Sequence, residues 1–253
     1  MIKEQVQQVT GAMNGKTVAI VGGGSGIGRA IAQAVSSQGG KTVLSSRTVS
    51  KLHEVASSLD DAMVVPVDMT DSPSVERWAA SVPMIDHLVI SASSAAHGSF
   101  AELDEGALRT MFDAKFFGPY RVAKAALSKL KDGGSITFFS GVLSRRPGMN
   151  CSGLGAVNGA VESLIYGLAL ELGPRLRVNC VSPGMIISDA YAEMDERARQ
   201  EMYEATGESL PVGRVGTVEE AAMAAQYLMT NTYSTGVVLD VDGGHMIRQY
   251  AKR

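Results

Sequence analysis

The chain has 253 residues, 45% of them hydrophobic, and a formal net charge of −3. This length suits one α/β domain with a full hydrophobic core, while the slight negative charge and the lack of a Lys/Arg tract argue against a nucleic-acid-binding protein. No apolar run stands out as long enough to span a bilayer, residues 1–15 lack the apolar core of a secretory signal, and two cysteines distant in sequence fit a reducing compartment. We therefore expect a cytoplasmic protein without a membrane partner.

Strands and helices are predicted to alternate along the chain. Residues 1–13 are polar and are predicted to form an arm before a single domain, residues 14–253. The predicted strands are residues 18–21, 41–46, 63–67, 85–91, 134–140, 177–181 and 236–241. The predicted helices are residues 30–35, 50–59, 72–81, 104–130 with an interruption near Gly118–Pro119, 152–172 and 217–229. This alternation predicts an α/β fold, a Rossmann-type doubly wound parallel sheet of about seven strands with helices on both faces.

A glycine-rich turn joins the first predicted strand to the first predicted helix. Gly22, Gly26 and Gly28 follow the strand directly, and an apolar helical run begins at Ala30. Such a turn directs helix N-terminal N–H groups at an anion: the first glycine allows the tight turn, the second lets a pyrophosphate approach, and the third lets the helix pack close. A glycine turn without a ligand is the alternative. The flanking strand and helix favour dinucleotide binding.

The spacing G-x-x-x-G-x-G and three longer segments resemble the short-chain dehydrogenase/reductase family. The segments are NGKTVAIVGGGSGIGRAIA at 14–32, LALELGPRLRVNCVSPGMI at 168–186, and residues 213–244. The resemblance covers residues 14–247 and implies an oxidoreductase with a nicotinamide cofactor. It also implies a homo-oligomer, most simply a tetramer, paired through residues 104–130 and 152–172. Further positions that it places around the cofactor are Ser25, Ile27, Met69, Ser91, Pro183, Gly184 and Ile186.

The residues after the second strand indicate the type of cofactor. An acidic residue there would bind the adenosine ribose diol, whereas Arg47 offers a charge-assisted fork to a 2′-phosphate and Ser46 adds a hydroxyl. We therefore predict NADP(H) rather than NAD(H), the alternative being a solvated loop arginine. Asp68 resembles the family residue that meets the adenine edge, but a turn aspartate that caps Thr70 is an equal alternative.

The resemblance fails at the residues that carry the family's proton chemistry. The positions of its Tyr, Lys and Ser are occupied by Leu154, Asn158 and Gly141, and its Asn position is occupied by Lys115. The family's lysine lowers the pKa of the tyrosine, which transfers the proton. Because Leu154 has no ionisable proton, ordinary carbonyl reduction by this chain is doubtful.

Lysine and asparagine are exchanged between the two helices that line the pocket in this family. We expect Lys115, Asn158 and the neighbouring Ser140 to be the candidate catalytic residues. Lys115 either restores a positive charge to the pocket from the opposite wall or extends its ammonium to the surface, and the sequence leaves both open.

Other polar residues near the predicted pocket carry less weight. His97 and Cys151 lack a visible partner, Arg145 and Arg146 are interpreted as a solvated loop pair, and no metal-ligand spacing occurs. Three functions remain: an oxidoreductase with altered proton delivery, a catalytically inactive nucleotide-binding or regulatory protein or inactive subunit, and an enzyme of another reaction class. The expected substrate is a small molecule. Its identity is unknown, because residues 186–213, where the resemblance places the substrate loop, contain no motif that indicates one.

Overall fold

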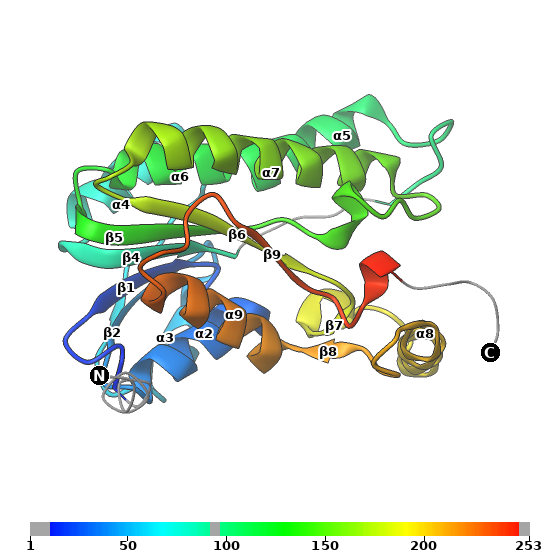
Figure 1. Cartoon of the computed structure of the whole chain (residues 1–253), viewed down its shortest axis with the longest axis horizontal. Coiled ribbons are helices and arrows are strands. Elements are labelled where there is room, and N and C mark those ends of the chain that lie inside the picture. Colours follow the sequence, from blue (N-terminus) through cyan, green and yellow to red (C-terminus); the bar gives the residue numbers. More distant parts are fainter. Residues whose placement is uncertain (1–10, 92–96, 248–253) are drawn as a thin grey trace.

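Seven parallel strands form the central sheet. The computed structural model describes residues 11–91 and 97–247, and the strand order is β3-β2-β1-β4-β5-β6-β9 (Figure 1). The strands are β1 (Thr17–Val21), β2 (Lys41–Ser45), β3 (Ala62–Val64), β4 (Ile85–Ile90), β5 (Leu130–Phe139), β6 (Arg177–Pro183) and β9 (Val238–Val241). The order reverses between β1 and β4, so the predicted doubly wound α/β fold is confirmed. Ligands of such sheets bind beyond the C-terminal strand ends at this reversal.

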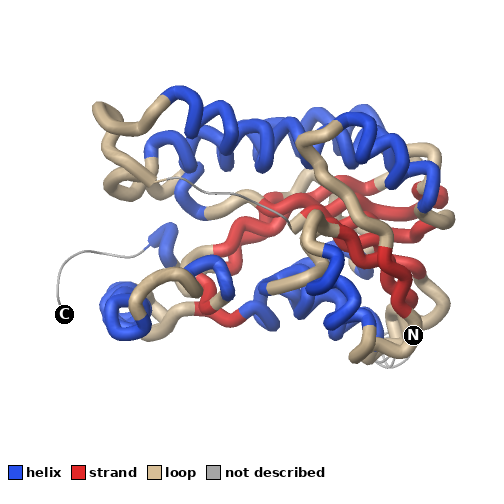
Figure 2. The backbone as a smooth tube through the Cα atoms, turned by 180° about the vertical axis from the view of Figure 1, so that it is seen from behind, coloured by secondary structure: helices blue, strands red, loops and turns tan. Residues whose placement is uncertain are grey.

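Helices cover both faces of the sheet (Figures 1 and 2). One face carries α2 (Gly26–Ser36), α3 (Val49–Ala56) and α9 (Val218–Thr230). The other carries α4 (Ser72–Ser81), α5 (Glu105–Phe112), α6 (Gly118–Ala126) and α7 (Ser152–Leu172). Beyond the C-terminal ends of the strands lie α8 (Glu196–Ser209) and a small sheet of β7 (Ile186–Ile187) and β8 (Gly216–Thr217).

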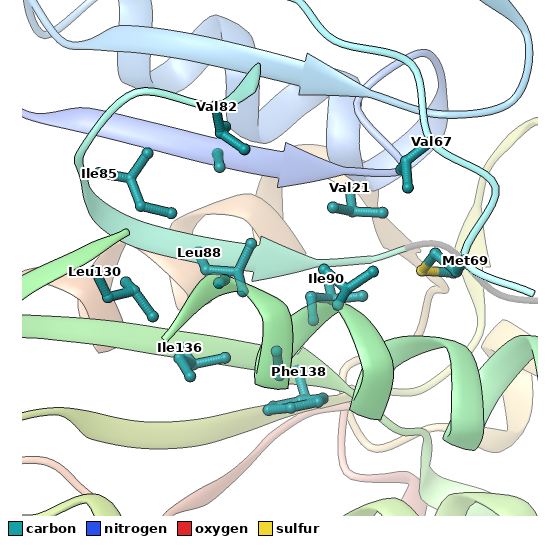
Figure 3. Close-up of a cluster of buried hydrophobic side chains, with 14 of the residues drawn as sticks. Val21, Val67, Met69, Val82, Ile85, Leu88, Ile90, Leu130, Ile136 and Phe138 are labelled. Carbon is teal, nitrogen blue, oxygen red and sulfur yellow. The ribbon is translucent and has the colours of Figure 1, made fainter. Parts of the chain in front are cut away.

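The two faces of the sheet enclose two hydrophobic cores. Alternating residues of one strand serve both: Leu88 and Ile90 of β4 point into the core under α4, α6 and α7, while Val89 points toward α2 and α9. Figure 3 shows the first of these cores, with Ile136 and Phe138 of β5 packed beside the β4 side chains. Burying each such side chain stabilises the fold by about 1.5–3 kcal/mol. The cores fix the strand ends that carry the candidate site.

The structure corrects the long helix predicted over residues 104–130. The segment divides into α5, a π-helical turn (Asp113–Phe117) and α6, and Leu130 already pairs with Ile85 as the first residue of β5. The interruption predicted near Gly118–Pro119 is present, because proline has no N–H for the helical ladder and the N–H of Gly118 bonds five residues back to Asp113. Between Pro119 and Gly133 the sequence holds no glycine or proline, so it did not reveal that α6 ends at Ala126.

Helix α8 and the small β7–β8 sheet are absent from the sequence-based prediction. Asp195 caps α8 by accepting the N–H of Ala198 at 3.0 Å, but only Tyr203 and Gly207 of the helix are buried. A helix with so few buried positions has no apolar periodicity to predict it.

Two further expectations from the sequence concern the N-terminal arm and the lack of a membrane-length segment. The predicted arm lies mostly outside the described residues, and its end, Met13, is fully buried beside Gly40. The expectation of no membrane-length apolar segment is wrong in one respect, because α7 is long and apolar enough by length and composition. In the fold α7 packs along the sheet through Val161 and Ile165.

Candidate functional site

The turn between β1 and α2 can be built only with glycine at its critical position. Gly22 and Gly26 have φ of +96° and +50°, in the left-handed region. A Cβ on Gly28 would lie 2.1 Å from the carbonyl oxygen of Gly22 and 2.8 Å from Ser91 Oγ. The helix therefore begins in direct contact with the strand ends, as the sequence motif predicts.

The N-terminus of α2 is open to an anion. Ser25 is the N-cap residue with extended backbone, and its side chain accepts no N–H of the first helical turn within the described part of the chain. A helix leaves its first N–H groups without intrahelical partners, and these groups with the helix dipole favour a phosphate. Ile27 packs against the core under α2.

The predicted cofactor residues surround one end of the sheet. A Cβ on Gly24 would lie 3.5 Å from Ser46 Oγ, and a Cβ on Gly26 would lie 3.9 Å from the Cβ of Ser188. The segment after β6 closes this side: Gly184 donates its N–H to Val241, and the buried Ile186 begins β7 beside Pro183. The glycine turn therefore lies between the end of β2 and Ser188, the residue that follows β7.

Arg47 and Asp68 lie together at the rim. Asp68 Oδ1 accepts the N–H and the hydroxyl of Thr70 at 2.9 and 2.7 Å, which confirms the turn-capping interpretation. These hydrogen bonds, with a contribution from the Arg47 charge, hold the pKa of Asp68 below its usual value. Arg47 is exposed, so its guanidinium is accessible to a ligand. Met69 is buried in the main core and serves packing there.

Lys115 is enclosed, so the alternative that its ammonium extends to the surface is wrong. It lies on the π-helical turn, is 8% exposed, and donates from Nζ to the carbonyl oxygen of Ser140 at 3.1 Å. Burial lowers its pKa from 10.5 to about 8. π-Helical turns occur frequently at functional sites. Lys115 therefore brings an amine with a titration near neutrality to the end of β5.

Asn158 contacts the same turn from α7. It is 2% exposed, and a Cβ on Gly141 would lie 3.0 Å from its Nδ2. Its Oδ1 has no hydrogen-bond partner among the described residues, although buried polar atoms are nearly always paired. Lys115 and Asn158 thus converge on the peptide between Ser140 and Gly141. This acceptor is available to a hydrogen-bond donor, such as a bound water or a ligand hydroxyl.

Leu154 lies in an apolar cluster. This small cluster is separate from the two main cores, and its buried members are Met111, Leu154 and Val157, against which Leu108, Phe112 and Leu143 pack. The residue that the sequence predicts at the family's tyrosine position is therefore an apolar side chain packed among apolar neighbours.

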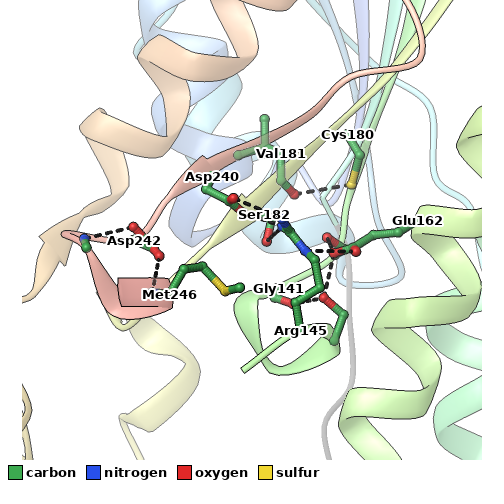
Figure 4. Close-up of polar contacts among 12 residues, drawn as sticks. Gly141, Arg145, Glu162, Cys180, Val181, Ser182, Asp240, Asp242 and Met246 are labelled. Carbon is green, nitrogen blue, oxygen red and sulfur yellow. Dashed lines mark hydrogen bonds and ion pairs between the residues drawn. The ribbon is translucent and has the colours of Figure 1, made fainter. Parts of the chain in front are cut away.

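Sequence reasoning missed a buried carboxylate, Glu162 (Figure 4). Its Oε1 accepts from Ser140 Oγ at 2.9 Å and from Ser144 Oγ at 2.7 Å, and its Oε2 lies 3.3 Å from Arg145 Nε. The available signal was a glutamate one helical turn after Asn158 in a mostly apolar helix.

Arg145 is not the solvated loop residue expected from the sequence. Its guanidinium pairs with both carboxylate oxygens of Asp240 on β9, and Nη2 lies 3.4 Å from Ser182 Oγ. The hydrogen bonds to Asp240 raise the pKa of Arg145 above its usual value. Arg145 therefore ties the loop after β5 to α7, β6 and β9.

The cysteines are not activated nucleophiles. Cys180 is fully buried, and burial raises the pKa of its thiol to about 12. Cys151 Sγ lies 3.5 Å from Nδ1 of His97, but burial raises the Cys151 pKa as well. In the described ranges no group of three potential ligands could hold a metal ion.

Comparison with known proteins gives consistent results. Residues 21–246 match a family described as Enoyl-(Acyl carrier protein) reductase. Galactitol 2-dehydrogenase (L-tagatose-forming) from Cereibacter sphaeroides is 32% identical over 252 residues, covering 93% of this chain and 96% of the relative. L-xylulose reductase from Homo sapiens is 30% identical over 238 residues, covering 91% and 96%.

Solved structures extend the similarity to the fold. A small-chain dehydrogenase in complex with NADPH is 34% identical, with a TM-score of 0.80 over 92% of this chain and 99% of that chain. The MalC reductase/Diels-Alderase from Malbranchea aurantiaca is 26% identical, with a TM-score of 0.87 over 94% and 99%. Because the match spans nearly the whole chain in both sequence and structure, the chain belongs to the short-chain dehydrogenase/reductase family of oxidoreductases, which use nicotinamide cofactors.

Proposed function

We propose that this protein is an NADP(H)-dependent oxidoreductase in which Lys115, from the π-helical turn, is the proton-transferring group. The observation that carries the proposal is the enclosed Lys115 amine, hydrogen-bonded to Ser140 and with a pKa lowered to about 8. A group with a pKa near the operating pH both gives and takes a proton efficiently.

The glycine turn fits a dinucleotide. A Cβ on residue 28 would collide with the carbonyl oxygen of Gly22, so only glycine allows this close approach. At the N-terminus of α2, the Ser25 side chain accepts none of the first N–H groups. These residues would hold the pyrophosphate, with Ser91 and Gly184 at the adjoining strand ends. NADPH, when bound, supplies the hydride.

Arg47 favours NADP(H) over NAD(H). Its exposed guanidinium follows β2 and lies near enough to Asp68 for its charge to lower that pKa. A guanidinium binds a 2′-phosphate with charge-assisted hydrogen bonds, and it has no such partner in NAD(H). Ser46, beside Gly24, adds a hydroxyl to the same rim.

Lys115 would give a proton to the substrate oxygen during reduction and take it back from water. Burial disfavours the charged ammonium, which makes it a stronger acid than a surface lysine. Asn158, whose Oδ1 lacks a donor, would accept a hydrogen bond from a hydroxyl in the same space. The apolar cluster around Leu154 excludes water from that wall.

A specific observation also favours binding without turnover. Leu154 is packed against its apolar neighbours and leaves nothing ionisable on α7 at the family's tyrosine position. In this second candidate function the chain keeps the nucleotide site as a regulatory protein or inactive subunit.

Two measurements on parent and Lys115→Met decide between these functions. Fluorescence titration with NADPH measures binding, and NADPH consumption with a panel of carbonyl compounds measures turnover. We expect tight binding by both proteins, slow turnover of a narrow set of compounds by the parent, and a loss of about 10²-fold or more in Lys115→Met. Turnover that persists in Lys115→Met contradicts the proposal, and binding without turnover by the parent supports the second function.

A further inference from the structure

Glu162 is a charged group that the proposed chemistry does not use. It lies on α7, one helical turn after Asn158, and is 6% exposed. A buried carboxylate is costly unless donors surround it, and an apolar residue of similar size would fill the same space at less cost. Packing alone therefore does not account for a glutamate at this buried position of α7.

The donors of Glu162 divide between its two oxygens (Figure 4). Both serine hydroxyls of the turn after β5 donate to Oε1, and the Arg145 guanidinium faces Oε2. Ser144 Oγ lies 2.7 Å from Glu162 Oε1 and 3.1 Å from the carbonyl oxygen of Gly141, so its one hydroxyl hydrogen is directed to the nearer, charged carboxylate. The carboxylate thus fixes both ends of the turn from Ser140 to Ser144.

The same turn supplies the hydrogen-bond acceptor of Lys115. Ser140 donates its hydroxyl to Glu162 and accepts Lys115 Nζ with its carbonyl oxygen, and its own N–H bonds to Val181 on β6. One residue therefore joins the buried carboxylate of α7 to the buried amine of the π-helical turn.

We propose that Glu162 is a positioning residue for Lys115, acting through Ser140: it holds the turn after β5 so that the Ser140 carbonyl faces the ammonium. The inference deepens the proposed function, since it names what orients the proton-transferring group. Arg145 neutralises Glu162 and is itself anchored by Asp240 on β9.

The other titratable groups near Lys115 leave this arrangement intact. Cys180 on β6 is a titratable neighbour of Lys115, but burial raises its pKa to about 12, so it is an uncharged thiol at the pH where Lys115 titrates. Asp113 on the same π-helical turn is paired with Arg121 at 2.7 Å. The Ser140 carbonyl is therefore the contact that stabilises the ammonium, and its loss should lower the Lys115 pKa further.

The test measures the titration of Lys115 in the full chain by NMR of isotope-labelled lysine side chains. The Lys115 signal is assigned by its absence in Lys115→Met. In Glu162→Met, which removes both acceptor oxygens, we expect the titration midpoint to fall by about one pH unit, while Glu162→Gln keeps one acceptor and shifts it by less than half as much. Ser140→Ala cuts the link itself and should shift the midpoint in the same direction, and the double variant Glu162→Met/Ser140→Ala should shift it no further.

Asp240→Asn is the matched control, because Asp240 contacts Arg145 and not Glu162. It should leave the Lys115 midpoint in place. Unchanged midpoints in Ser140→Ala and in Glu162→Met overturn the inference, and Ser140→Ala alone decides it if Glu162→Met fails to fold. A shift in Asp240→Asn as large as that in Glu162→Met also overturns it, since the effect would then be general electrostatics.

The NMR titration needs no turnover, so the two proposals fail separately. If Lys115→Met abolishes turnover while the Glu162 variants leave the Lys115 midpoint unchanged, the proposed function stands and the positioning role falls. If the Glu162 variants shift the midpoint while Lys115→Met keeps full turnover, the positioning role stands and the proposed function falls.

Discussion

Gly141 and Asn158 are sterically matched: a Cβ on Gly141 would lie 3.0 Å from Nδ2 of the buried Asn158. The sequence resemblance predicts that these residues stand at the positions of the family's serine and lysine. The match explains why position 141 holds a residue without a side chain, because Asn158 fills the space that a side chain would need.

Substituting Gly141 should therefore destabilise the fold. We expect Gly141→Ala to lower the free energy of unfolding by about 1–3 kcal/mol through overpacking against Asn158, measured by denaturant titration. The double variant Gly141→Ala/Asn158→Ala should lose less than the sum of the single changes, because the clash is absent. Gly159→Ala on α7, where a Cβ meets nothing within 4 Å, is the control and should be neutral or stabilising. Additive effects in the double variant would refute the steric match.

Arg47 should determine the choice between the two nicotinamide cofactors. The parent should bind NADPH more tightly than NADH, and Arg47→Asp should reverse the order, because a carboxylate repels the 2′-phosphate and accepts from a ribose diol. Fluorescence titration of both nucleotides gives the ratio. Arg77→Asp makes the same change of charge at an exposed position of α4 and should keep the parent's preference for NADPH. Equal affinity of the parent for both nucleotides would contradict the role of Arg47.

His87 should make the protein less stable in mild acid. Burial first, and then the charge of Arg177, lowers the His87 pKa from 6.5 to about 4, and Nδ1 lies 2.9 Å from Ser135 Oγ. The unfolded chain therefore binds a proton that the folded chain does not, so stability falls as pH decreases from about 6.5 to about 4, by of order 3 kcal/mol in total.

The upper part of that interval isolates His87. Glu220, with a pKa lowered to about 2, loses its contribution only as pH falls below its ordinary value of 4.5. Urea titrations between about pH 7 and 5 should give a slope in the parent and a flat profile in His87→Gln. His53→Gln, on the exposed side of α3, should keep the parent's slope. A parent profile that is flat over the same interval would disprove the assignment.

The exposed apolar side chains of α6 and α7 should lie in a subunit interface. Tyr166 and Leu170 of α7 are 57% and 84% exposed, and Tyr120 of α6 is 39% exposed. We expect light scattering to give the mass of a tetramer for the parent and a smaller species for Leu170→Asp, since a buried aspartate is costly. Met84→Asp, at a 50% exposed loop position, should leave the mass unchanged. A monomeric parent at micromolar concentration would exclude the interface.

The fold was predictable because its local signals agree with one another. Apolar strands, the glycine turn and capping residues such as Asp71, which accepts the N–H of Ser74, all favour the same elements. The failures occur where tertiary contacts decide: α8 has only two buried residues, and the division of residues 104–130 depends on how Leu130 pairs with Ile85.

The candidate site was predictable in position and less so in detail. The glycine turn was identified from its spacing between a strand and a helix, and Lys115 from the resemblance to the family, whose Asn position it takes. The ion pair between Glu162 and Arg145 was missed because the two residues are 17 positions apart and Arg145 lies in a loop, where no periodicity indicates which residues are in contact. Only the three-dimensional structure brings Arg145 to Asp240, 95 residues away.

A crystal structure of the complex with NADPH tests the central claim most directly. The account predicts the phosphates at the N-terminus of α2, the 2′-phosphate at Arg47, and the nicotinamide end beside Lys115 and the turn from Ser140 to Gly141. The contradicting result is a complex in which the nicotinamide end is excluded by Leu154 and Asn158, or lies away from Lys115, since that lysine could not then transfer the proton.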